Sequence, residues 1–252
     1  MHHNAIEIQT LDHRYSDGTV ALQQITLSIH ANERVALIGT NGSGKSTLLQ
    51  HLNGVILPQT GQITVGHYPM RSKYLEEIRN FVGLVFQNPD DQIFMPTVWE
   101  DLSFGPLNQG LDDRTIHKLC QEAMNAVGLN LQDYGHRNPG KLSGGEKKRI
   151  AIAGVLAMQP EVLALDEPTA QLDPRSRRQL IQVLAKLPIT QLIATHDLDL
   201  ALELCRRTIV LSQGKLVYDG PTEKVLYHRE FLEQHGLEIP LSYSRPYCCL
   251  RD

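Results

Sequence analysis

Residues 39–47 read G-T-N-G-S-G-K-S-T, and this stretch decides the fold of the chain. It fits the pattern G-x-x-x-x-G-K-[ST] and follows the continuous apolar run 35–38, which is typical of a buried strand. Glycines allow backbone N–H groups to turn inward around phosphate oxygens, and a helix that begins near Lys45 directs its positive end to the same place. The stretch therefore predicts a phosphate-binding loop between a strand and a helix.

The side chains of this loop have separate expected roles. Lys45 is expected to neutralise the β and γ phosphates of a nucleotide, and Ser46 is expected to ligate Mg²⁺. The alternative, a glycine-rich connection before an ordinary helix, is disfavoured because strand and helix signals flank the loop. The residues expected to hold the nucleotide here are Gly39, Asn41, Gly42, Ser43, Gly44, Lys45, Ser46 and Thr47.

A second apolar run, 162–165, ends in the acidic residues Asp166 and Glu167. Asp166 would hold Mg²⁺, usually through water, and Glu167 would orient or deprotonate an attacking water. An apolar run that ends in two acids is also common where a strand reaches solvent. The two acids therefore indicate a catalytic site only in combination with the phosphate loop. Together the two elements predict hydrolysis of a nucleoside triphosphate.

Strand and helix signals alternate along most of the chain. Further strands are expected at 25–29, 62–65, 81–86, 191–194 and 209–211. Helices are expected at 71–79, 116–127, 175–186 and 198–205. This alternation predicts an α/β fold whose mostly parallel sheet is covered on both faces.

Strand signals nearly vanish over residues 88–158, which predicts a helical insertion. Its clearest amphipathic stretch, 116–127, can be capped by Asp112 or Asp113 and ended by Gly128. Beyond the last strand, residues 215–218 indicate a small added hairpin, and the tail that follows has helical character at first.

Residues 142–146 read L-S-G-G-E and stand directly before the helical run 147–158. They resemble the signature sequence L-S-G-G-Q of ABC-type ATPases, and the resemblance covers nearly the whole chain, from residue 6 to residue 220. It implies the ABC-type ATPase core of P-loop NTPases, with an antiparallel β subdomain and a helical subdomain inserted at about 88–158. The ATPase domain would span 1–220, followed by a short tail over 221–252.

The resemblance also implies roles for residues outside the two motifs. Tyr15 falls where such proteins stack an aromatic ring on adenine, and Gln87 matches a glutamine that takes part in hydrolysis and in binding Mg²⁺. His196 matches a histidine that donates to the γ-phosphate or positions Glu167. Gln171 departs from the small residue that is common at its position in the loop 170–173.

The signature offers a second phosphate site. Ser143, Gly144 and Gly145 lie at a helix N-terminus, where free N–H groups and the helix dipole favour an anion. In ABC-type ATPases the signature faces the phosphate loop of a second chain in a head-to-tail dimer. The resemblance therefore implies a homodimer or heterodimer of ATPase subunits that encloses two ATP molecules with their Mg²⁺ ions.

Residues 86–101 and 104–108 resemble the energy-coupling-factor branch of ABC importers. The run F-G-P-L-N at 104–108, like residues 151–158, is similar to the cobalt and nickel members. The resemblance implies integral-membrane transport and substrate-capture subunits as partners. Phe94 and Trp99 would be exposed apolar anchors for a membrane partner, and ordinary core packing is the alternative for both.

We therefore expect an ATP hydrolase that powers import of a small substrate, with cobalt or nickel ions as the favoured substrate. ATPases of vitamin importers share the architecture but often carry longer C-terminal extensions. A soluble ABC-type scaffold ATPase of iron–sulfur assembly stays open as an alternative. A chromosome-maintenance head is disfavoured because it needs a long coiled coil or a basic surface, and a translation-associated ABC protein because it needs two motif sets.

Composition limits the remaining function classes. A formal net charge of -4 argues against a nucleic-acid partner. The longest apolar run, 150–158, is far shorter than the roughly 18 residues of a membrane span, and the first ten residues carry no export signal. We expect a peripheral protein at the cytoplasmic face of the cell membrane.

Neither the four cysteines nor the eleven histidines follow a metal-site spacing, so reduced thiols are expected and no metal site formed by this chain alone. His2 and His3 are either native or an added segment.

Overall fold

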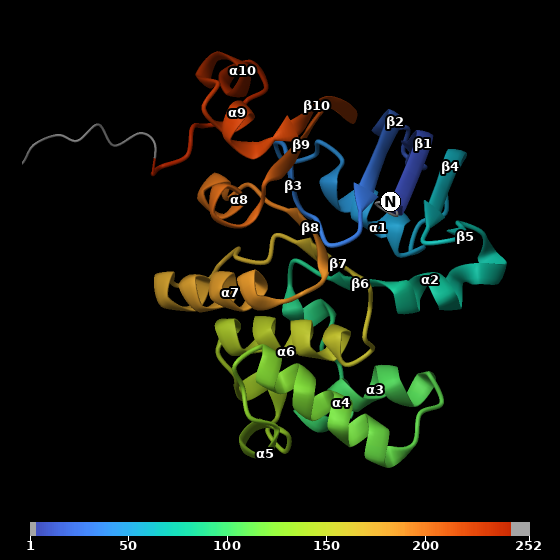
Figure 1. The fold of residues 1–252 in the computed structure, drawn as a ribbon, viewed down its shortest axis with the longest axis vertical. Coiled ribbons are helices and arrows are strands. Elements are labelled where there is room, and N and C mark those ends of the chain that lie inside the picture. Colours follow the sequence, from blue (N-terminus) through green and yellow to red (C-terminus); the bar gives the residue numbers. More distant parts are fainter. Residues whose placement is uncertain (1–3, 243–252) are drawn as a thin grey trace, which may run out of the picture.

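The computed structural model describes residues 4–242 and contains two sheets and a separate group of helices (Figure 1). The smaller sheet is antiparallel, with strand order β2-β1-β4-β5. Its strands are β1 (Asn4–Arg14), β2 (Val20–His30), β4 (Thr60–Val65) and β5 (Tyr68–Pro69). This sheet is the antiparallel part that the resemblance implied.

The larger sheet has the order β10-β9-β3-β8-β7-β6. Its strands are β3 (Arg34–Ile38), β6 (Val82–Val85), β7 (Val162–Asp166), β8 (Thr190–Ala194), β9 (Arg207–Ser212) and β10 (Lys215–Pro221). The central pairings are parallel, and only β10 runs antiparallel, to β9. Because parallel strands end at the same edge, the segments after β3, β7 and β8 meet there.

Side-chain alternation on the central strand β3 separates two hydrophobic cores. Val35 and Leu37 pack in the core shared with the antiparallel sheet and with α1 (Lys45–Leu52). Ala36 and Ile38 point to the opposite face and pack in the core shared with the helices of the insertion. All four residues are fully buried, as the continuous apolar run predicted.

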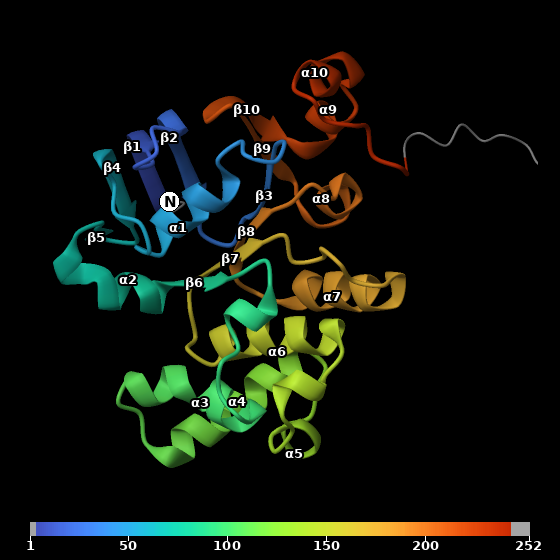
Figure 2. The same ribbon diagram turned by 180° about the vertical axis from the view of Figure 1, so that it is seen from behind.

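The remaining helices lie around the larger sheet, and the views from front and back show α7 and α8 on the side opposite α2 (Figure 2). These helices are α2 (Leu75–Phe81), α7 (Pro174–Lys186), α8 (Leu198–Leu204), α9 (Thr222–Leu226) and α10 (Arg229–Gln234). Both faces of the sheet are therefore covered, as an α/β fold requires.

Helices α3 to α6 gather at the end of the molecule away from the antiparallel sheet (Figure 1). They are α3 (Val98–Asn108), α4 (Asp113–Ala126), α5 (Leu131–Tyr134) and α6 (Gly144–Leu156). The Asp112 side chain caps α4 by accepting from the N–H groups of Arg114 and Thr115, and Gly128 follows the helix with a φ of 71°. The helical insertion is present, with the cap and the stop that the sequence indicated.

Several element boundaries differ from the sequence prediction, including those near residues 71, 81 and 144. The helix expected at 71–79 begins as a 3₁₀ turn, Ser72–Tyr74, and the α-helix then runs to Phe81. Phe81 was expected to begin a strand, but β6 begins only at Val82, whose N–H still caps the helix on Ile78. Helix α6 begins at residue 144 rather than 147, because Ser143 and Glu146 form a capping box at its start.

Some sequence features fall outside the described range. His2, His3, Cys248 and Cys249 are among them, as is the end of the tail from residue 243. Within residues 4–242, no helix is long and apolar enough to cross a membrane.

Candidate active site

The phosphate loop closes tightly between β3 and α1. A Cβ atom at Gly44, which has a φ of 104°, would meet the carbonyl oxygen of Ala21, and one at Gly39 would meet that of Leu211. Only glycine fits these two positions, because the loop passes so close to the backbone of β2 and β9. The loop is thereby held against both sheets.

The Lys45 side chain is buried inside the loop. Its ammonium group donates hydrogen bonds to the carbonyl oxygens of Gly39 (2.8 Å) and Thr40 (3.1 Å). Burial lowers the pKa of Lys45, while the nearby Glu167 and Asp166 carboxylates oppose that shift. The loop therefore keeps one cation enclosed among backbone dipoles at the start of a helix.

Asp166 ends β7 beside the loop. Its Oδ1 atom is buried and has no hydrogen-bond partner. Burial raises the pKa of this carboxyl, and a hydrogen bond from the Ser46 hydroxyl opposes the rise. A buried carboxylate oxygen without a hydrogen-bond donor is suited to bind Mg²⁺ or a metal-bound water, and the Ser46 hydroxyl lies beside Asp166.

No group of three or more His, Cys, Asp or Glu residues that could hold a metal ion occurs among residues 4–242. A Mg²⁺ ion at Asp166 would therefore take its other ligands from hydroxyl groups, amide groups, water and the nucleotide.

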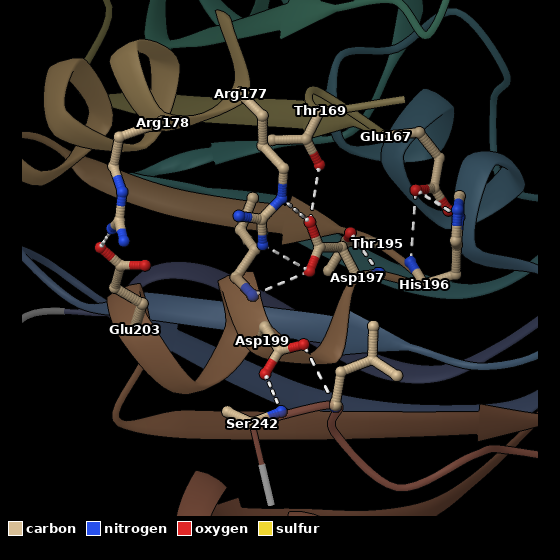
Figure 3. A network of polar contacts seen from close by, with 12 residues as sticks. Glu167, Thr169, Arg177, Arg178, Thr195, His196, Asp197, Asp199, Glu203 and Ser242 are labelled. Atoms are coloured by element: carbon tan, nitrogen blue, oxygen red, sulfur yellow. Dashed lines mark hydrogen bonds and ion pairs between the residues drawn. The ribbon is translucent and has the colours of Figure 1, made fainter. Parts of the chain in front are cut away.

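Glu167 and His196 point toward one another across the end of the larger sheet (Figure 3). The Glu167 carboxylate accepts from His196 Nδ1 at 2.8 Å and from the His196 backbone N–H at 3.2 Å. Glu167 is buried and has a φ of 46°, whereas the His196 side chain is 64% exposed. The Glu167 backbone is therefore strained, its carboxylate is fixed by two hydrogen bonds, and the histidine reaches outward from it.

A cavity of about 420 Å³ brings these elements together. It is lined by Tyr15, Thr19, Ala21, residues 41–47, Gln87, Glu167 and His196. The Tyr15 ring is 40% exposed, and its hydroxyl is hydrogen-bonded to that of Thr47 at 2.8 Å. One chain therefore supplies an exposed aromatic ring, a phosphate loop, an amide and a carboxylate–histidine pair around one space.

The signature residues do not line this cavity. Ser143 is exposed at the N-terminus of α6, and a Cβ atom at Gly144 would meet no atom within 4 Å. Gly145, in contrast, packs against Ser176. The structure places the predicted second phosphate site on an open surface of α6.

Two residues that sequence reasoning passed over lie close to the site. Asp197 accepts two hydrogen bonds from the Arg177 guanidinium, at 2.6 and 2.8 Å, and caps α8 through the N–H of Leu200 (Figure 3). Burial works in the opposite direction, but the Arg177 hydrogen bond and that from Leu200 hold the pKa of Asp197 below its ordinary value. An aspartate directly before a helical run was the available signal.

The second missed residue is Lys148, four positions before Ile152 on the buried face of α6. Its ammonium group donates to the carbonyl oxygen of Gln87, and burial lowers its pKa to about 8. A lysine at the spacing of an apolar helix face was the available signal.

The loop after Gln87 exposes apolar side chains on the helical insertion. Phe94 is 64% exposed and contacts Phe104 edge-on, with the ring centroids 5.0 Å apart. Trp99, expected as a second anchor, instead packs against the helical core and beside His117. The ordinary packing alternative therefore holds for Trp99.

Comparison with known proteins agrees with this geometry. The family model described as ABC transporter matches residues 22–170. A protein of Gloeobacter violaceus named as an ABC transporter ATP-binding protein is 56% identical over 238 residues, which is 94% of this chain and 98% of that protein. The energy-coupling factor transporter ATP-binding protein EcfA of Methanoculleus marisnigri is 44% identical, over 93% of this chain and 86% of its own length.

Two solved structures share the fold. One is CbiO1 from Clostridium perfringens, described as part of the ABC transporter complex CbiONQ, with a TM-score of 0.80, 38% identity, and coverage of 92% of this chain and 94% of that one. The other is the dimeric ATP-binding cassette MJ0796 bound to ADP and phosphate, with a TM-score of 0.77, 27% identity, and coverage of 86% and 98%. The chain therefore belongs to the ABC transporter family, as an ATP-hydrolysing, ATP-binding protein of the energy-coupling-factor type.

Proposed function

We propose that this chain hydrolyses ATP at the cavity around Lys45 in order to power an energy-coupling-factor importer, with cobalt or nickel ions as the transported substrate. The observation that carries the proposal is the cavity itself, in which the phosphate loop meets the Glu167–His196 pair.

ATP would enter with its adenine on the exposed Tyr15 ring and its phosphates in the loop 39–47. Tyr15 is held in place through the hydroxyl of Thr47, which belongs to the same loop. On binding, the Lys45 ammonium would exchange its carbonyl partners for β and γ phosphate oxygens, a charge-assisted contact that is stronger than the one it leaves. Base stacking and phosphate binding would therefore be linked through one short segment.

Mg²⁺ would be held by Ser46, by Asp166 through water, and by Gln87, together with the phosphates. When bound, the ion neutralises charge on the β and γ phosphates. The orphaned Asp166 Oδ1 atom supports this assignment, because a buried carboxylate oxygen with no donor is costly unless a cation or its water is near.

Glu167 would accept a hydrogen bond or a proton from the attacking water, and His196 would donate to the γ-phosphate. The hydrogen bond from His196 Nδ1 to Glu167 supports this division, because it fixes the orientation of the imidazole. The donor to the γ-phosphate would be Nε2–H, which requires a ring that carries a proton on both nitrogens. Arg177 keeps Asp197, the neighbour of His196, in place.

Ser143, Gly144 and Gly145 would bind the γ-phosphate held by a partner chain in a head-to-tail dimer. Their open position on α6, away from the cavity of their own chain, supports this arrangement, as does the dimeric state of the MJ0796 cassette. The partner chain would be a second copy of this chain or another ATPase subunit.

Transport requires that ATP hydrolysis reach a membrane subunit. The exposed cluster Phe94, Phe104 and Leu107 lies on α3 and the loop before it, a short distance along the chain from Gln87. We propose that this apolar cluster docks an integral-membrane subunit and places the chain at the cytoplasmic face of the cell membrane. The resemblance of residues 104–108 to the cobalt and nickel members of this branch supports these ions as the substrate.

The experiment is co-purification from solubilised membranes, with partners identified by mass spectrometry, combined with cobalt and nickel uptake in cells. Phe94→Glu should weaken recovery of the membrane partner by roughly thirtyfold, which corresponds to about 2 kcal/mol, and should stop uptake. Its matched control is Val55→Glu, which places the same charge at another exposed apolar residue.

ATP binding by the isolated Phe94→Glu subunit should stay near normal, because no phosphate contact is lost. Wild-type recovery and uptake in this variant would remove the apolar cluster from the interface. Uptake of a vitamin without any metal dependence would replace the proposed substrate.

A further inference from the structure

Lys148 is the most buried lysine or arginine among residues 4–242. The residue is 2% exposed and sits in the second turn of α6, five positions after Ser143. Its neighbour Lys147 reaches the surface instead and forms an ion pair with the exposed Asp90 at 2.6 Å. Two adjacent lysines therefore have different environments on the same helix.

The Lys148 ammonium contacts backbone carbonyls from two other parts of the fold. It donates to the carbonyl oxygen of Gln87 and lies 3.4 Å from that of Phe86, just after β6. It also lies 3.5 Å from the carbonyl oxygen of Glu167, just after β7. One side chain thus joins α6 to the backbone of two residues assigned to hydrolysis.

Burial of an ammonium group at this position is unfavourable in free energy. Transfer of a cation from water into the protein interior is unfavourable unless hydrogen bonds and opposite charges compensate it, and an apolar side chain of similar volume usually packs at least as well. The compensation here comes from the carbonyl contacts and from the Asp166 and Glu167 carboxylates nearby. Among these partners, Gln87, Asp166 and Glu167 are residues assigned to the hydrolytic site.

We propose that Lys148 is a positioning residue for ATP hydrolysis. It holds the backbone at Gln87 and at Glu167 in one arrangement relative to α6, the helix whose N-terminus carries Ser143. Lys148 thereby connects the cavity to the signature of the same chain. A shift of α6 then carries the Gln87 carbonyl with it, so the signature and the hydrolytic site arrive in register.

The proposal rests on the roles given above to Gln87 and Glu167, and it predicts a separation of binding from turnover. Lys148 does not line the cavity, so its loss removes no contact to the nucleotide. Its loss does release two backbone segments that must be placed to a fraction of an ångström for the water to be aligned. The rate should therefore fall while ATP affinity does not.

The test compares Lys148→Met with Lys147→Met in the purified full chain. Methionine keeps the length and packing of the side chain but donates no hydrogen bond. We expect ATP affinity, measured by equilibrium binding of a fluorescent ATP analogue, to stay within about twofold of wild type in both variants. The turnover number should fall by about tenfold or more in Lys148→Met alone.

A third variant, Lys148→Gln, restores two N–H donors without the charge and should recover part of the lost turnover. It also serves as the test if Lys148→Met does not fold. A folded Lys148→Met protein that turns over within about twofold of wild type would overturn the proposal, as would a loss confined to ATP affinity.

Glu167→Gln, measured in parallel, distinguishes a failure of the site assignment from a failure of the positioning role of Lys148. If it hydrolyses ATP normally, the site assignment itself has failed. If only the Lys148 variants behave like wild type, the positioning role has failed while the site assignment stands.

Discussion

The loop 39–47 and the signature 142–146 each present a helix N-terminus to a phosphate, yet they are built differently. At the loop, Lys45 is buried, and the adjacent cavity is lined by the Tyr15 ring and the Glu167–His196 pair. At the signature, Ser143 is exposed, and its hydroxyl donates to the carboxylate of its own Glu146 at 2.7 Å. The first region is assembled within one chain, whereas the second has only backbone and hydroxyl groups to offer.

The difference indicates that the loop and the signature would supply different parts of a composite site. In the proposed mechanism a cation and a general base are needed once per nucleotide, and Lys45 and Glu167 lie together at the loop. The signature adds donors only, so it can complete a site that another chain has already filled. Variants that damage one region should therefore leave the function of the other measurable.

The largest effect is expected from Lys45→Ala, which breaks the first region. It removes the enclosed cation directed at the β and γ phosphates, so affinity for MgATP should fall by about a thousandfold. Isothermal titration calorimetry on the isolated chain measures this, with circular dichroism as the check on folding. Unchanged affinity would remove Lys45 from the nucleotide site.

Glu167→Gln should separate binding from chemistry within the same region. ATP should still bind, but hydrolysis should slow by about a hundredfold or more, because the amide cannot accept the proton of the water. Size-exclusion chromatography with ATP should then show a trapped dimer. A blocked enzyme that stays monomeric would contradict the dimer arrangement.

Ser143→Arg alters the signature and leaves the loop 39–47 intact. Hydrolysis should fall by about tenfold or more, because a bulky side chain now covers the α6 N-terminus. ATP loading onto the loop of the same chain should be unaffected in a monomer binding assay. An equal loss of monomer binding would place Ser143 in the site of its own chain.

A smaller effect is expected at a residue that supports the loop region but is not assigned a contact with the nucleotide. Arg177→Gln leaves the half-buried Asp197 without its main partner and should lower stability by about 2 kcal/mol, with hydrolysis reduced several-fold. Arg178→Gln is the matched control, because the Arg178–Glu203 pair is exposed and should cost at most about 0.5 kcal/mol. Urea unfolding curves of the two variants measure the difference, and equal losses would deny Asp197 a special role.

The sequence predicted most of the first region, because its chemistry is local in the chain. Residues 39–47 lie between a strand and a helix, and Asp166 and Glu167 directly follow a strand, so their positions follow from the ends of parallel strands. Tyr15, Gln87 and His196 came only from resemblance, and the structure places all three in the same cavity. Their roles remain predictions.

Tertiary contacts explain what was missed. The carbonyl partners of Lys148 lie far from it along the chain, so no local pattern marks them. The strand β1 was not recognised because its pairing with β2 shifts register between Ile8 and Leu11, where Thr10 has a φ of 47°. Such a bulge interrupts the alternation by which a strand is detected.

Mixing two inactive variants tests the central claim that the two regions of different chains form one site. Glu167→Gln supplies an intact signature and Ser143→Arg supplies an intact loop with its carboxylate, so a mixed dimer contains one complete site. Equimolar mixing before ATP is added should restore about a quarter of the wild-type hydrolysis rate, since half of the dimers are mixed and each has one of two sites intact. A rate that stays at the sum of the two separate variants would contradict the account.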